Sequence, residues 1–151
     1  MKKLLLIISL LLSLISCEEQ EVIREIDASE FQLKNGIYYA LNEEKPYSGN
    51  VTSFYPNGQL DSEMTVVNGQ PDGLVQKWYE SGQLEGALTF VDGKPEGLNR
   101  WWYENGQLRL ESTFVNGEGN GVSRQWHEDG SVKSEDCFKG SEYTDMSNCN
   151  E

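Results

Sequence analysis

The sequence predicts an all-β protein: an elongated antiparallel meander of repeated β-hairpins, with about eight strands or slightly more. The hexamer YENGQL at residues 103–108 has near-copies at 55–60, 79–84 and 127–132. Between the turn signals lie stretches of roughly six to eight residues rich in Thr, Val, Phe, Trp and Tyr, which are strand residues. Glycines recur every 24 residues in three registers: Gly49, Gly73, Gly97 and Gly121; Gly58, Gly82, Gly106 and Gly130; and Gly69, Gly93 and Gly117.

The hexamer supplies the first turn of each unit. Its central dipeptide is Asn-Gly at 57–58 and 105–106, Ser-Gly at 81–82 and Asp-Gly at 129–130. Such dipeptides suit a two-residue turn that needs positive φ, which predicts that Tyr55 pairs with Leu60 across the hairpin.

The second connection reads NGQPDG at 68–73, DGKPEG at 92–97 and NGEGNG at 116–121. Its proline and glycines oppose helix formation, so it joins two strands. A loop of even length preserves the alternation of side chains, and Val67 is therefore expected to meet Leu74 on one face.

Strand alternation then predicts two apolar faces. The tryptophan face carries one column of rings, together with the pairs Val67 and Leu74, Val91 and Leu98, and Val115 and Val122; the column is Phe54, Trp78, Trp102 and Trp126. The tyrosine face collects the remaining apolar positions: Tyr55, Leu60, Met64, Val66, Tyr79, Leu84, Leu88, Phe90, Tyr103, Leu108, Leu110 and Phe114.

The N-terminal segment predicts a lipoprotein signal peptide at residues 1–16. Lys2 and Lys3 precede an apolar run over 4–15; a helix of that length spans ~18 Å, well short of a ~30 Å hydrocarbon core. The sequence Leu-Ile-Ser-Cys at 14–17 resembles a bacterial lipobox, although a plain signal peptide with a chance cysteine is an alternative. The resemblance implies acyl chains such as palmitate on Cys17. It also implies a place in the bacterial cell envelope, anchored in the outer membrane and facing the periplasm or the surface.

The rest of the chain divides into three parts. An acidic tether is expected at 17–35 and a C-terminal tail at 141–151. The repeat domain spans 36–140, with a partial leading repeat and units near 49–72, 73–96, 97–120 and 121–140. Cys137 and Cys149 are an even pair in an oxidising compartment. They are candidates for a disulfide that pins the tail, the alternative being two independent thiols.

The repeated residues resemble the MORN repeat, in particular the bacterial variant labelled YwqK-type antitoxin. The pattern is carried by residues 73–97 and 97–121, nearly as well by 49–73, and GIYYALNEEKPYSG at 36–49 looks like the partial leading repeat of that family. The fourth unit departs, with His127 for tyrosine and Ser131 for glutamine, and terminal repeats are often atypical because they cap the open end. The resemblance implies a repeat sheet and, through the family label, an antitoxin-like role.

Composition and motifs favour a non-enzymatic protein without cofactor or metal. The net charge is −13, and about −15 without the leader, which argues against nucleic-acid partners. His127 is the one histidine, at a position where the repeat has an aromatic ring, and no nucleophile, metal or phosphate-loop motif occurs. The acids Glu63, Glu111 and Glu135 share a repeat position; they form either a solvated row that discourages edge pairing or a cation-binding row.

The aromatic columns are the candidate binding residues: Trp78, Trp102, Trp126, Tyr79 and Tyr103. The alternative is a structural spine in which rings of consecutive hairpins stack. Basic residues near the stripe interrupt the acids: Arg100, Arg109, Arg124 and Lys133. We expect a lipid-anchored module that binds or scaffolds a protein partner. An antitoxin-like neutraliser and a glycan-binding module remain alternatives, and exposed sheet edges make edge-to-edge self-association a further expectation.

Overall fold

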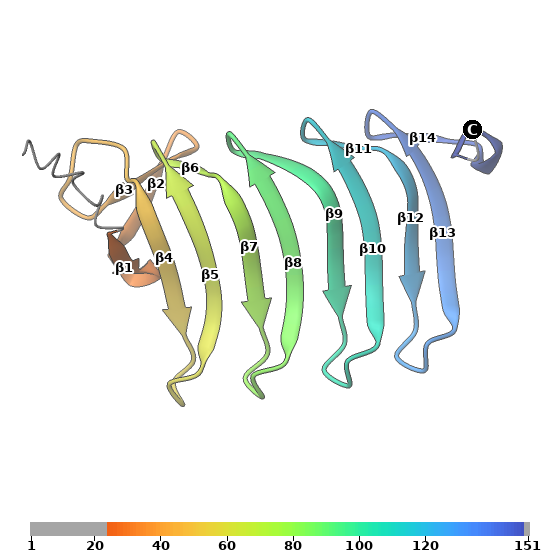
Figure 1. Cartoon of the computed structure of the whole chain (residues 1–151), viewed down its shortest axis with the longest axis horizontal. Helices are drawn as coiled ribbons and strands as arrows, with labels where there is room; N and C mark the ends of the chain where they lie inside the picture. Colours follow the sequence, from red (N-terminus) through yellow and green to blue (C-terminus); the bar gives the residue numbers. More distant parts are fainter. Residues whose placement is uncertain (1–23, 150–151) are drawn as a thin grey trace, which may run out of the picture.

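The computed structural model describes residues 24–149, so the predicted signal peptide at 1–16 and Cys17 lie outside the described residues. One 12-stranded sheet runs the length of the molecule as a single layer (Figure 1). The predicted all-β antiparallel meander is confirmed. Eight long strands follow one another in chain order: β4 (Gly49–Phe54), β5 (Leu60–Val67), β7 (Gly73–Trp78), β8 (Leu84–Val91), β9 (Lys94–Trp102), β10 (Leu108–Val115), β12 (Gly121–Trp126) and β13 (Val132–Lys139).

Short elements complete the sheet. Two-residue strands β6 (Gln70–Pro71) and β11 (Glu118–Gly119) extend the pairing of β5 and β10. The outer strands are β1 (Glu25–Asp27), which runs parallel to β4, and β14 (Glu142–Thr144), antiparallel to β13. The parallel β1 is an exception to the predicted antiparallel order. Both outer strands have three residues, and very short edge strands limit pairing with other chains.

The hexamer turns have three residues rather than the two predicted. The amide of Tyr55 donates to the carbonyl of Gln59 at 2.8 Å, and the amide of Gly58 donates back to Tyr55 at 2.8 Å. Gly58 alone adopts positive φ, at 85°, whereas Asn57 does not. This is a turn closed by a glycine in the left-handed region, followed by a bulge. The other three hexamers repeat the same two backbone bonds.

The two-residue turn with positive φ occurs instead at the opposite end of the sheet (Figure 1). Asn68 and Gly69 have φ of 49° and 78°, and Val67 pairs directly with Gln70. Asp92-Gly93 and Asn116-Gly117 are equivalent. The two-residue turn that the sequence predicted for the first connection of each unit is therefore found at the second connection, and the first connection has a three-residue turn.

The three-residue turn changes the face of one residue per unit. Phe54, not Tyr55, pairs with Leu60, and the register shifts by a bulge before Ser53 pairs with Ser62. The same shift pairs Trp78 with Leu84 and, two strands on, residue 102 with residue 108. The prediction that these leucines share the tyrosine face is wrong: Leu60, Leu84 and Leu108 lie on the tryptophan face.

The N-terminal end carries a cap and the only fully buried apolar cluster among the described residues. The hairpin of β2 (Phe31–Lys34) and β3 (Ile37–Ala40), with η1 (Ala28–Glu30), belongs to this cap. Phe31 stacks on Tyr38 with ring centroids 4.8 Å apart. The cluster joins cap and first unit: Ile26, Ala40, Tyr47, Val51 and Val66, flanked by Phe31, Tyr38 and Met64.

Two domain boundaries need correction. Residues 25–34 were predicted to belong to the tether, but they form β1, η1 and β2. Ile26 is only 8% exposed and packs in the core, and this burial holds the segment in place. At the other end, the predicted tail contains β14 and η2 (Met146–Cys149). The structure places a disulfide between Cys137 and Cys149, whose Cα atoms lie 6.0 Å apart. Within residues 24–149 there is no helix with the length and apolar character needed to cross a membrane.

Candidate functional site

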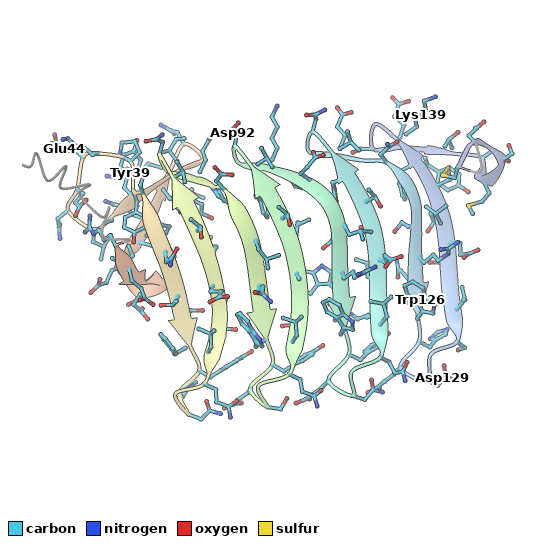
Figure 2. The ribbon with its side chains drawn as sticks, viewed as in Figure 1. Tyr39, Glu44, Asp92, Trp126, Asp129 and Lys139 are labelled. Carbon is cyan, nitrogen blue, oxygen red and sulfur yellow. A yellow bond between two sulfur atoms is a disulfide. The ribbon has the colours of Figure 1, made fainter. Side chains whose placement is uncertain are left out.

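The tryptophan face presents the predicted column of rings. Phe54, Trp78, Trp102 and Trp126 are the last residues of β4, β7, β9 and β12, and their equivalent registers put them on one face. Figure 2 shows Trp126 near the hexamer end of the sheet, above the turn with Asp129. The tryptophans are half-buried, while Phe54 at one end is 55% exposed and Val132 at the other is 57% exposed.

The rings do not stack on one another within the described residues. Equivalent strands of consecutive units are two strand spacings apart, ~9.6 Å, and ring pairs require ~4.5–7 Å. Leucines occupy the intervening strands. Leu84 and Trp102, with Gln83 and Gly106, line a shallow groove of about 330 Å³. The column is thus an alternating row of rings and aliphatic side chains.

A charged row lies beside the aromatic column. Arg100 pairs with Glu111 at 2.7 Å, and Arg124 pairs with Glu135 in the next unit. Both pairs lie on the tryptophan face because each bridges directly opposed residues two positions before a tryptophan. Two of the three acids of the predicted row, Glu111 and Glu135, are therefore neutralised by arginine.

A second apolar row lies beyond the charges. Its residues are 41% to 50% exposed: Val67, Leu74, Val91, Leu98 and Val115. Together with Phe54 and Val132, these are all the exposed large apolar side chains between residues 49 and 139. Every one of them lies on the tryptophan face. The face carries two apolar rows separated by a charged row.

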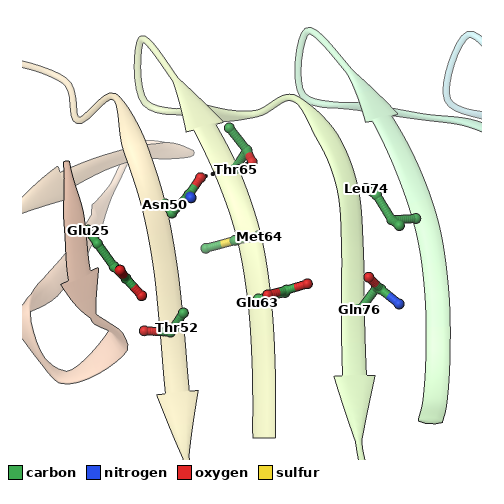
Figure 3. Close-up of a pocket in the computed structure, with 8 residues that line it drawn as sticks. All are labelled: Glu25, Asn50, Thr52, Glu63, Met64, Thr65, Leu74 and Gln76. Atoms are coloured by element: carbon green, nitrogen blue, oxygen red, sulfur yellow. Dashed lines mark hydrogen bonds between the residues drawn. The ribbon is translucent and has the colours of Figure 1, made fainter. Parts of the chain in front are cut away.

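A further groove of about 300 Å³ opens on this face near the N-terminal cap (Figure 3). Thr52, Glu63 and Gln76 line its middle, and the Thr65 hydroxyl donates to the Asn50 side-chain oxygen at 3.1 Å. The groove is polar where the equivalent positions of later units carry arginine.

The predicted binding tyrosines point to the opposite face and link the units. The hydroxyl of Tyr79 donates to the carbonyl of Trp102 at 2.7 Å. Tyr55 and Tyr103 make the same bond one unit earlier and one unit later, to residues 78 and 126. Burial raises the pKa of Tyr79, while the positive charge of Arg109 acts in the opposite sense. His127 occupies this position in the fourth unit, whose outer neighbour among the described residues is the short strand β14 and not another hairpin unit.

Trp101, which lies on the tyrosine face, was not predicted from the sequence as a site residue. Its repeat equivalents are Ser53, Lys77 and Gln125, so periodicity gave no signal for it. Arg109 was placed near the tryptophan stripe, but its guanidinium lies over the Trp101 ring at 5.6 Å and the Tyr103 ring at 6.0 Å. The bulge after residue 108 turns this side chain toward the tyrosine face.

In the part of the chain that the structure describes, no cluster of three or more His, Cys, Asp or Glu side chains could hold a metal ion. A protein-family model described as "MORN repeat variant" matches the chain at residues 47–68, 71–92, 95–116 and 120–139. These four matches cover more than half of the chain and follow the four hairpin units. No curated protein and no solved structure matches it.

Proposed function

Because the chain belongs to the MORN repeat variant family, whose repeats indicate a protein-binding or membrane-binding module, we propose that it is a non-enzymatic, lipid-anchored scaffold of the bacterial envelope. In this proposal the tryptophan face binds a protein partner. The anchor is an acyl modification of Cys17, supported by the lipobox resemblance at 14–17.

One observation carries the proposal. All the exposed large apolar side chains of residues 49–139 gather on one face of a single-layer sheet. Soluble monomers rarely expose contiguous apolar patches larger than a few hundred square ångströms, and larger patches mark interaction sites. The two apolar rows would supply the apolar contacts of such an interface. The Arg-Glu pairs between them differ from the usual arrangement, in which charged residues lie at the rim.

Charge selects a protein partner over an anionic membrane or nucleic acid. The net charge of −13 repels phosphate-rich surfaces. Acids also lie at both ends of the tryptophan face, as Glu80 and Glu104 in the hexamer turns and Asp92 in the second turns. The partner that fits presents aliphatic or aromatic side chains bordered by lysine or arginine.

In-cell photocrosslinking tests the docking face. A photoreactive residue at position 98 replaces a leucine that is 49% exposed on the tryptophan face, and one at position 41 replaces a leucine that is 48% exposed in the cap. We expect a protein adduct from position 98 alone. The adduct from position 98 should disappear when Leu74, an exposed leucine of the same row, is changed to lysine, because Leu74→Lys repels a cationic partner. It should persist in Leu41→Lys. Equal adducts from both positions would refute the assignment of the face.

The same experiment separates the two alternatives. An antitoxin-like role predicts that the adduct at position 98 contains a toxin, and that Leu98→Lys removes protection from it. A glycan-binding role is favoured by the groove shared by Leu84 and Trp102. It predicts retention on peptidoglycan or polysaccharide that is lost in Trp102→Ala and unchanged in Leu98→Lys.

The anchor has its own test. Cells labelled with a palmitate analogue should incorporate it into the wild-type chain and not into Cys17→Ser, which should leave the membrane fraction. Equal labelling of both chains would contradict acylation at Cys17 without affecting the docking proposal.

A further inference from the structure

The tyrosine face carries an arginine whose charge no carboxylate within the described residues neutralises. Arg24, Arg100 and Arg124 each pair with a glutamate. Arg109 makes no such pair between residues 24 and 149, and its guanidinium instead lies over two aromatic rings. Stacking occupies the flat side of a guanidinium and leaves its in-plane N–H donors available for a planar acceptor.

The support under Arg109 is built from several fixed contacts. The Trp101 indole N–H donates to the Asn99 side-chain oxygen at 2.8 Å, and the Asn99 amide donates to the Ser112 hydroxyl at 3.1 Å. Asn99 is 7% exposed, so this network is largely shielded from water. Gly86 lies directly opposite Trp101, and a Cβ there would approach the ring to 2.6 Å. The hydrogen bond to Asn99 and the contact with Gly86 therefore fix the position of the Trp101 ring.

An apolar groove adjoins this support. It has a volume of about 310 Å³ and extends between β10 and β12 to the second turns. Leu110, which pairs with Trp101, forms its near end, and Ser141 belongs to its far end. Phe114 and Phe138 supply apolar walls, while Asn99, Ser112 and Ser123 supply polar groups.

We propose that this groove and Arg109 form a binding site for an acidic peptide segment of a protein partner. An apolar side chain of the segment fills the groove between Phe114 and Phe138, and a carboxylate about four residues along the extended segment pairs with the Arg109 guanidinium, because five strand residues, ~16 Å, separate Phe114 from Arg109. The site lies on the face opposite the tryptophan rows, so it is independent of the docking surface proposed above.

Charge around Arg109 explains why the ligand is a single carboxylate and not a polyphosphate. Lys77, Glu85 and Glu104, like Arg109, lie close enough to Tyr79 for their charges to influence the pKa of its hydroxyl. Glu85 already pairs with Lys77 at 3.1 Å. One arginine beside these acids can neutralise one negative charge. A dense polyanion would meet the net −13 of the chain.

NMR spectroscopy of the ¹⁵N-labelled full-length chain tests the site. Trp101 is one of four tryptophans, so its indole N–H signal can be followed separately from the three on the tryptophan face. The probes are the capped peptides acetyl-Phe-Val-Ser-Val-Asp-amide and acetyl-Phe-Val-Ser-Val-Asn-amide. We expect the Asp peptide to shift the Trp101 and Arg109 side-chain signals saturably, with about tenfold tighter binding than the Asn peptide, as for a charge-assisted pair.

Two variants supply the control. Arg109→Gln should abolish the preference for the Asp peptide. Arg124→Gln, which changes an arginine on the other face that already pairs with Glu135, should retain it; the dispersed spectrum of each variant reports its fold. Equal binding of the two peptides would overturn the proposal, as would shifts confined to the tryptophan face. Absence of a saturable Trp101 shift would show that Arg109 only covers the ring.

Discussion

Replacing Gly86 with alanine should destabilise the protein by about 1–2 kcal/mol. The added Cβ would lie 2.6 Å from the Trp101 ring, closer than side-chain carbons pack, so the ring must move. Overpacking of this kind costs ~1–3 kcal/mol. The glycine itself is not in the left-handed region, so alanine recovers ~0.5–1 kcal/mol of the conformational cost of a strand glycine. The steric term is the larger, and the net effect is a loss.

Urea unfolding of a double-mutant cycle measures this balance. In the background Trp101→Gln, which carries the residue that the fourth unit has at this position, the obstruction is gone. Gly86→Ala should then stabilise the protein by about 0.5 kcal/mol, because only the backbone term remains. The effect of one substitution changes sign with the identity of the residue opposite it.

The reasoning is refuted if Gly86→Ala is equally destabilising in both backgrounds. That result would mean that the glycine is required for its backbone and not for the space that the ring occupies. The free energy of unfolding is calculated from the urea midpoint and from the slope of that free energy against urea concentration. A slope that differs between variants would point to a change in the unfolded chain.

Three further predictions concern one bond between units, the disulfide and the turn of the fourth hexamer. Tyr79→Phe removes one hydroxyl bond to Trp102 and should lower the free energy of unfolding by about 1 kcal/mol; His127→Phe at the equivalent position should change it little, and equal losses in urea unfolding would contradict the link. Cys149→Ser opens a loop with a sequence separation of 12, which corresponds to ~2–3 kcal/mol; a melting temperature insensitive to both this change and a reductant would contradict it. The bond from Ser131 lowers the pKa of Asp129, so its stabilisation is present above the ordinary pKa and lost as pH falls through the folded value. The stability difference between wild type and Asp129→Asn should thus shrink below about pH 4, and a difference that grows on acidification would reverse the sign of the argument.

The period and the hairpins could be predicted because they depend on residues that recur. The 24-residue spacing is even, so equivalent side chains return to the same face, and the tryptophan column followed directly. The turn type was wrong because Asn-Gly occurs at both connections. Ser81 was the informative departure: serine rarely adopts the positive φ that a two-residue turn requires at its first position. Asn68, Asp92 and Asn116 keep the residue types that do.

Features that occur once were harder to predict. Other residue types occupy the positions equivalent to Trp101, Gly86 and Arg109 in the other units, so the association of these three became visible only through the pairing of β8, β9 and β10. Residues 25–34 were assigned to a tether because their acidic residues outnumber Ile26 and Phe31, although those two side chains pack in or against the buried cluster. Periodicity therefore predicted the repeated hairpins, whereas the site around Trp101 and Arg109 could be recognised only from the three-dimensional structure.

The tyrosine bonds each connect residues that are 23 positions apart, from one hairpin to the next. A genetic duplication of residues 73–96 would therefore create its own donor and acceptor at the new junction. Each added unit of two strands would lengthen the sheet by ~9.6 Å without disturbing either terminus. The length of the sheet is consequently a quantity that evolution, or an engineer, can change by copying one segment of DNA.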